Sequence, residues 1–254
     1  MLKTHKKLAR SGGMVAATAA TLAMVAAGCT VGPPQGNAAI QGTATKDVAA
    51  VVEIDVTSSV ANSFRTSAQD AIAGAIVRRA GQPHGVIHLY VRKIDHNPGD
   101  DSAAIATYRI PAVYECSTAN PFDQNCRRRH ERTAAEAVSK AKRIARKIRA
   151  LRVRVAHAGT VIRGGLAIAG EILAKEPGEK WLVVASDMRP SSTKRHKRPL
   201  IKLDNVNVVV LYACSQGIAH CQERQNAWQA ELEHDGAVRP VTFLFSQQMP
   251  DLWR

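Results

Sequence analysis

Hydrophobic positions follow two different patterns along the chain. Short apolar runs rich in Val and Ile predict buried strands at residues 51–54, 86–94, 181–186, 206–212 and 241–245, with a further short strand at about 106–110. Longer stretches with apolar side chains three or four residues apart predict helices at residues 62–80, 129–151 and 222–232, and within 157–173 after a Gly-Thr turn at 159–160. Because strands alternate with helices, the sequence predicts an α/β fold with a doubly wound, mainly parallel sheet flanked by helices.

The composition agrees with this fold and bounds its size. Of the 254 residues, 45% are hydrophobic but only 4% are aromatic, so Ala, Val and Ile must form most of the core. β-Branched strands packed against helix faces of small residues suit such a composition. The length allows one domain of about 200 residues with extra segments, or two smaller domains.

The beginning of the chain has the pattern of a secretory signal. Four cations and no acid precede an apolar stretch at residues 14–27, which is too short for a comfortable membrane span. The next residues, Ala-Ala-Gly-Cys ending at Cys29, resemble the bacterial lipobox. This resemblance implies that residues 1–28 are a signal peptide and that Cys29 carries lipid. The alternative is an ordinary secreted protein in which Cys29 is incidental.

The segment after Cys29 predicts a tether. Residues 30–45 are uncharged and rich in Gly, Pro, Ala and Thr, so we expect a flexible connection over residues 29–47 and one folded domain over 48–254. Lipid on Cys29 would anchor the protein without spanning the bilayer. The expected location is therefore the extracytoplasmic face of a bacterial cell membrane, with the membrane surface as one partner.

The chain is strongly basic. It holds 35 Lys and Arg against 21 Asp and Glu, a formal charge of +14, and +10 remains after residues 1–28 are removed with their four cations. Between residues 127 and 154 there are twelve Lys and Arg and two Glu. This run predicts either a solvated helix face or a patch for anionic lipid head groups or cell-wall polymers.

Five cysteines fit an exported protein. With Cys29 set aside for lipid, proximity in sequence favours the disulfides Cys116–Cys126 and Cys214–Cys221 among three possible pairings. No CxxC pair is present, so the sequence does not predict a cysteine-rich metal site.

Oxygen-bearing side chains follow the first predicted strand. Asp55, Thr57 and Ser59 stand at every second position where the strand ends. Such spacing can direct one carboxylate and two hydroxyls to a single point, and hard oxygen donors suit Mg²⁺, Mn²⁺ or Ca²⁺. The alternative is a strand end with ordinary turn-forming residues.

Three segments together, DVTSS at 55–59, GTVIRGGLAIA at 159–169 and WLVVASDM at 181–188, resemble the von Willebrand factor A (VWA) domain. That family's metal ion-dependent adhesion site has the motif D-x-S-x-S, a separate Thr before a helix, and an Asp that ends the central strand. The resemblance implies metal ligation by Asp55, Thr57, Ser59, Thr160 and Asp187, with Thr57 in place of the usual Ser. It covers about residues 50–245.

The same resemblance implies a function. We expect Mg²⁺, or Mn²⁺ or Ca²⁺, as the cofactor and a partner protein whose exposed acidic residue completes the coordination. If the strands ending at Asp55 and Asp187 are neighbours, their carboxylates meet at the switch point of the sheet, where a cation relieves their repulsion. The basic residues 189–198 would attract an acidic partner to that edge, or alternatively form a mobile basic loop with no partner.

Other functions remain as alternatives. A Mg²⁺-dependent phosphatase of the haloacid dehalogenase type would use Asp55, but Thr57 stands where that class has a second acid, and the common catalytic motifs are absent from the sequence. We therefore do not expect an enzyme. Nucleic acid is not an expected partner of an exported protein whose basic helix is poor in aromatics. A metal-free VWA-like domain that binds anionic envelope polymers through the basic helix is the remaining alternative.

Overall fold

The computed structural model describes residues 45–94, 104–116, 123–151, 161–189 and 199–244. The chain divides into two units, Met1–Ala39 and Ile40–Arg254, and all described residues belong to the second. Cys29, Thr160 and the basic residues 190–198 lie outside the described ranges. None of the described helices combines the length and the apolar character that crossing a bilayer requires.

Six strands and four helices make up the described unit. The strands are β1 (Val48–Asp55), β2 (Ile87–Ile94), β3 (Ala104–Ile110), β4 (Glu179–Ser186), β5 (Val206–Tyr212) and β6 (Thr242–Leu244). The helices are α1 (Asn62–Ala80), α2 (Gln124–Ala150), α3 (Ile162–Lys175) and α4 (Ile218–His234).

The strands form one sheet in the order β3-β2-β1-β4-β5-β6. All neighbouring strands are parallel except β2 and β3, which are antiparallel. The chain builds outward from β1 to β3, then returns to the middle and builds outward from β4 to β6. The prediction of a doubly wound, mainly parallel α/β sheet is confirmed, and its switch point lies between β1 and β4.

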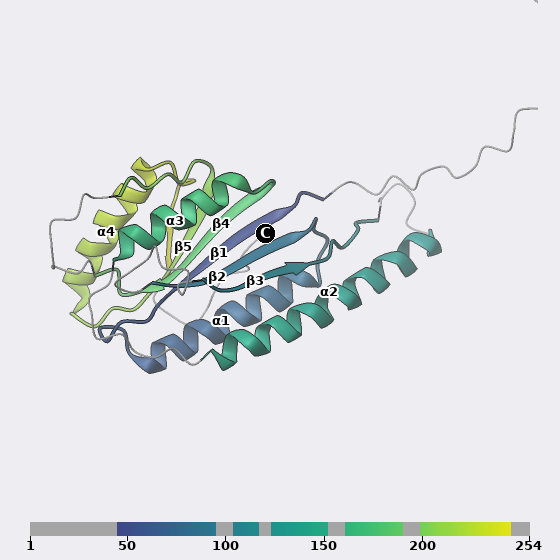
Figure 1. Cartoon of the computed structure of the whole chain (residues 1–254), viewed down its shortest axis with the longest axis horizontal. Coiled ribbons are helices and arrows are strands. Elements are labelled where there is room, and N and C mark those ends of the chain that lie inside the picture. The colour runs from purple at the N-terminus through teal and green to yellow at the C-terminus, as the bar shows by residue number, and fades with distance from the viewer. Residues whose placement is uncertain (1–44, 95–103, 117–122, 152–160, 190–198, 245–254) are drawn as a thin grey trace, which may run out of the picture. The chain divides into compact units, whose positions relative to one another are not determined.

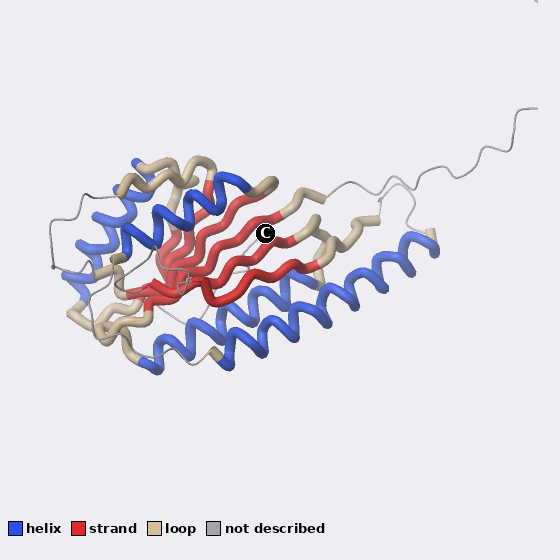
Figure 2. The backbone as a smooth tube through the Cα atoms, in the orientation of Figure 1, coloured by secondary structure: helices blue, strands red, loops and turns tan. Residues whose placement is uncertain are grey.

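Helices cover both faces of the sheet (Figures 1 and 2). On one face α1 and α2 lie side by side, and residues such as Ile72 and Ile144 pack with Val52 in one apolar cluster. On the other face α3 and α4 pack Leu166 and Leu232 against strand residues in a second cluster. Strand β1 is buried on both faces along its whole length. Such burial explains its unbroken apolar run.

Two helices begin at residues other than the predicted ones. Helix α2 starts at Gln124 rather than 129, because the Asp123 carboxylate accepts hydrogen bonds from the backbone N–H groups of Asn125 and Cys126. Helix α3 starts at Ile162, as expected for a helix that follows the Gly-Thr pair in the sequence. Helix α4 starts at Ile218 rather than 222; residues 218–220 are exposed, so no apolar stripe marks them in the sequence.

The structure pairs Cys116 with Cys126 and Cys214 with Cys221, the pairing predicted from sequence proximity. The Cα–Cα distances of 5.8 Å and 5.9 Å fall within the usual range for disulfides. The first disulfide joins the segment after β3 to the first turn of α2, and the second joins the segment after β5 to the first turn of α4. Each therefore fixes the entry to a helix.

Candidate functional site

The carboxyl ends of β1 and β4 lie next to each other at the centre of the sheet. Their register pairs Ile54 with Ala185, so Asp55 lies level with Ser186 and one residue before the level of Asp187. All three polar side chains are at most 1% exposed. In an open α/β sheet, ligands bind at this position, beyond the carboxyl ends of the strands at the switch point.

The Asp55 carboxylate is held by hydrogen bonds at both oxygens. Its Oδ1 accepts from the backbone N–H of Thr57 at 2.9 Å and from the Thr57 hydroxyl at 2.7 Å. Its Oδ2 accepts from the Ser186 hydroxyl at 2.7 Å. These bonds fix the orientation of the carboxylate, and no basic side chain within the described ranges forms an ion pair with it.

Hydroxyl groups lead from this buried carboxylate to the surface. The Oγ1 of Thr57 lies 3.0 Å from the Oγ of Ser59, and Ser59 is exposed whereas Thr57 is buried. The structure therefore brings Asp55, Thr57 and Ser59 together, as the spacing in the sequence predicts. Each oxygen in the series lies within hydrogen-bond distance of the next.

The turn after β4 fixes the direction of Asp187. Met188 has a φ of 52°, an unusual left-handed conformation for a residue other than glycine. Two hydrogen bonds hold it there: its N–H donates to the Ser186 hydroxyl at 2.9 Å, and its carbonyl accepts from the Trp228 indole at 2.8 Å. Helix α4 therefore contributes to the site through Trp228.

Asp187 is only partly satisfied by its surroundings. Its Oδ1 accepts a hydrogen bond from the backbone N–H of Arg189 at 3.0 Å. Its Oδ2 is buried and has no hydrogen-bond partner among the described residues, although the Arg189 Nε lies 3.7 Å away. A buried carboxylate oxygen without a hydrogen bond is costly, so this atom is a candidate ligand for a cation.

Burial raises the pKa of Asp55 above its ordinary value. The hydrogen bonds from Ser186 and Thr57 act in the opposite direction, and the negative charge of Asp187 adds to the rise in pKa. The two carboxylates thus lie close enough to repel each other in a region that excludes water. A divalent cation between them would stabilise both in the ionised form.

Arg65 on α1 is a basic residue near the site. It is 6% exposed, and its Nη1 donates to the Thr57 carbonyl at 2.8 Å while its Nη2 donates to the Asn62 Oδ1 at 2.5 Å. Burial lowers the pKa of Arg65, and the charge of Asp55 acts to raise it. The guanidinium thus fixes the loop that carries Thr57, and its positive charge interacts with the Asp55 carboxylate.

The oxygen atoms of the described site residues suit a small, hard cation as ligands. Asp55, Thr57, Ser59 and Asp187 offer two carboxylates and two hydroxyls, the oxygen ligands that Mg²⁺ and Mn²⁺ prefer. Within the described ranges, no group of three or more His, Cys, Asp or Glu side chains gathers that could hold a metal. Any metal site here must therefore rely on hydroxyls and on ligands from elsewhere. Thr160, the fifth predicted ligand, is not among the described residues.

Ser186, Arg65 and Trp228 are not among the site residues that the sequence predicts. Ser186 directly precedes a predicted ligand at the end of a buried strand, and a polar residue at that position is a signal that could have been used. Arg65 and Trp228 lie on helices in other parts of the sequence, and their contacts to the site depend on packing.

Comparison with known proteins gives structural likenesses only. No family model matches the chain, and no curated protein matches its sequence. The solved structures that resemble it include the pilus adhesin SpaC from Lactobacillus rhamnosus GG, at 15% identity and a TM-score of 0.35, over 57% of this chain and 15% of the adhesin. They also include the type V pili tip protein Mfa5 from Porphyromonas gingivalis, at 19% identity and a TM-score of 0.33, over 56% of this chain and 20% of the Mfa5 chain.

A third similar structure is the manganese-loaded TRAP protein of Plasmodium vivax. The identity is 11% and the TM-score 0.37, over 78% of this chain and 68% of that chain. The chain spans about a fifth or less of the length of the two pilus proteins.

Proposed function

We propose that the protein is a VWA-like binding module that holds a divalent cation at Asp55, Thr57, Ser59 and Asp187 and uses it to bind an acidic group of a partner protein. The cation would be Mg²⁺, or Mn²⁺ or Ca²⁺, and Thr160 would be a further ligand. A bound cation supplies an open coordination position that accepts a carboxylate oxygen from outside the chain.

One observation carries the proposal. Two buried carboxylates, Asp55 and Asp187, end adjacent strands at the switch point of a parallel sheet, and the Asp187 Oδ2 has no hydrogen-bond partner among the described residues. A pair of carboxylates with no cationic ligand would be expected to destabilise the fold, because burial disfavours their ionised forms. Retaining such a pair is understandable if a cation binds between them.

The hydrogen bonds around Asp55 favour binding over catalysis. A phosphatase that used Asp55 as a nucleophile would need a second acid two residues later to move a proton, and that residue is Thr57. The Thr57 hydroxyl donates to Asp55 rather than accepting from it, and the other Asp55 oxygen is bonded to Ser186. We therefore propose a binding function and no enzymatic one.

The position of the site suits a tethered protein. The described chain enters the sheet at Val48, and Asp55 lies at the opposite end of the same strand, on the order of 25 Å away for eight extended residues. We propose that lipid on Cys29 anchors the protein at the extracytoplasmic face of a bacterial membrane. The cation site would then lie at the edge of the sheet remote from the point where the tether enters.

The experiment is retention of the whole protein on an immobilised oligo-glutamate peptide, in Mg²⁺ and in chelator. The expected result is retention in Mg²⁺ that chelator removes and that Asp55→Ala abolishes. The matched control is Asp204→Asn, which changes an exposed acid just before β5 and should leave retention intact. Thermal melting of each variant checks that the fold survives, and retention unaffected by both chelator and Asp55→Ala would refute the proposal.

A further inference from the structure

A polar pocket of about 520 Å³ lies between the first turns of α1 and the last turn of α2. Its polar lining comes from Asn62, Arg65, Thr66, Gln69 and Arg149. Two of these side chains are guanidinium groups and none of the lining residues is acidic. The pocket is therefore suited to an anion.

The pocket is connected to the candidate cation site through Arg65. This residue lines the pocket and at the same time donates to the carbonyl of Thr57, in the loop that carries two of the proposed ligands. Both sites thus lie at the edge of the sheet where β1 ends. A single extended ligand could reach from one to the other.

The part of helix α2 that leads to the pocket is densely basic. Its last ten positions before Ala150 hold six Lys and Arg and no acid, namely Lys140, Lys142, Arg143, Arg146, Lys147 and Arg149. All are exposed except Lys140, which is half-buried. Among ion pairs between described residues, only Arg149 with Asp70 involves a cation of this segment. Cations in the last turn of a helix stabilise it, but that effect is confined to the last turn and does not account for six.

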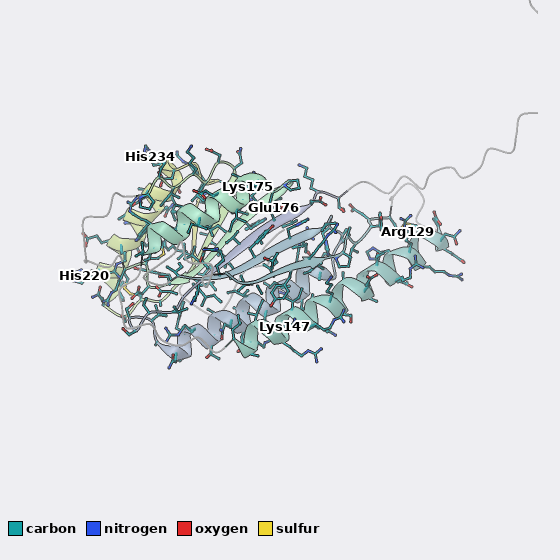
Figure 3. The ribbon with its side chains drawn as sticks, in the orientation of Figure 1. Arg129, Lys147, Lys175, Glu176, His220 and His234 are labelled. Atoms are coloured by element: carbon teal, nitrogen blue, oxygen red, sulfur yellow. A yellow bond between two sulfur atoms is a disulfide. The ribbon has the colours of Figure 1, made fainter. Side chains whose placement is uncertain are left out.

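The two ends of α2 differ in how far acidic residues offset their positive charge. Figure 3 labels Arg129 and Lys147, which lie towards opposite ends of the helix. The cations near the beginning of the helix, from Arg127 to Arg132, are interspersed with Glu131 and follow the capping Asp123. The positive charge is therefore least compensated at the end that borders the pocket and Asp55.

Resting on the proposed function, we infer that the acidic partner is an extended segment with several carboxylates, one of which binds in the pocket between Arg65 and Arg149 while another reaches the cation. Arg149 would donate a charge-assisted hydrogen bond to the partner carboxylate, in exchange for its exposed pair with Asp70. The other cations of α2 would attract the segment and hold it along the helix.

The sequence that follows the pocket residue Leu151 carries charge of the same sign as the pocket. The residues that follow Leu151 in the sequence include Arg152 and Arg154 and no acid before residue 171. Like charges would oppose their entry between two guanidinium groups. An external acidic ligand matches the pocket better.

The test measures binding of a fluorescent oligo-glutamate peptide to the whole protein by anisotropy, in Mg²⁺ and in chelator. Arg149→Gln is expected to weaken binding in Mg²⁺ about tenfold, since a hydrogen bond between charged groups is lost. The matched control Arg128→Gln removes the same charge from an exposed position at the other end of α2, and should change the affinity less than about twofold. Asp70→Asn should strengthen binding, because it releases Arg149 from its ion pair.

The results separate this inference from the proposed function. If chelator weakens binding but Arg149→Gln binds as well as Arg128→Gln does, the inference about the pocket is wrong and the proposed cation site stands. A loss in Arg149→Gln without any chelator effect would support the pocket and contradict the cation site. Binding of anionic phosphatidylglycerol vesicles in the absence of peptide binding would also overturn the inference, because the basic surface would then serve a membrane.

Discussion

Replacing Ser186 with Ala tests the hydrogen-bond arrangement of the site. The Ser186 hydroxyl donates to the Asp55 Oδ2 at 2.7 Å and accepts from the Met188 N–H at 2.9 Å, and the side chain is fully buried. A hydrogen bond to a charged group contributes about 1.5–3 kcal/mol, and a buried donor left without a partner costs a further 1–3 kcal/mol or so. Allowing for partial relaxation, we expect Ser186→Ala to lower the free energy of unfolding by roughly 3 kcal/mol.

The effect should depend on pH. Burial raises the pKa of Asp55 in the folded protein, so between its ordinary value and the raised one the folded state binds more protons than the unfolded state. Stability contributed by this group is therefore highest at acid pH and falls as the pH rises through that window. The Ser186 bond lowers the pKa of Asp55, so its loss should cost more as the pH rises and the carboxylate ionises than at acid pH.

The assay is urea unfolding of the chelator-treated protein with its disulfides intact, followed by tryptophan fluorescence at neutral and at acid pH. The control is Ser59→Ala, which removes an exposed hydroxyl from the same site and should cost less than about 0.5 kcal/mol. If Ser186→Ala costs no more than this control, or costs the same at both pH values, the arrangement described around Asp55 is wrong.

Two further substitutions test other features of the fold. Arg92→Ala should lower the free energy of unfolding by about 3–5 kcal/mol, since the Arg92 Nε lies 3.0 Å from the Oε1 of fully buried Glu53. The double variant that also carries Glu53→Gln should regain part of this loss, and urea unfolding measures both variants. In thermal melts, Gly178→Ala should destabilise the protein more than Gly217→Ala does. Both glycines have a positive φ, at 82° and 87°, but only at Gly178 would an added Cβ collide with the carbonyl oxygen of Asp47. A loss of only about 1 kcal/mol at both glycines would show that backbone conformation alone matters there.

The central part of the sheet could be predicted from sequence because burial on both faces leaves a clear pattern. The runs ending at Asp55 and Ser186 are apolar over most of their length, and each is followed or ended by polar residues, so the edge that carries the site is visible in the sequence. Helix α1 also begins and ends at the predicted residues, 62 and 80. In each case the signal lies in the local sequence.

Features that depend on packing were not predictable in the same way. Arg65 would be assigned to a solvated helix face by its charge, yet it is buried against the Thr57 carbonyl. Trp228 has the character of an ordinary core residue, and its bond to the Met188 carbonyl requires α4 to lie across the end of β4. The start of α2 was also misplaced, since its first turns are exposed and basic and only the Asp123 cap marks them.

The most direct test of a cation between Asp55 and Asp187 is titration of the whole protein with Mn²⁺ in a calorimeter, with Asp187→Ala and the control Asp204→Asn measured alongside. We predict one site in the wild type and in Asp204→Asn, no measurable binding in Asp187→Ala, and competition by Mg²⁺. Absence of Mn²⁺ binding by the wild type, or equal binding by Asp187→Ala, would contradict the account.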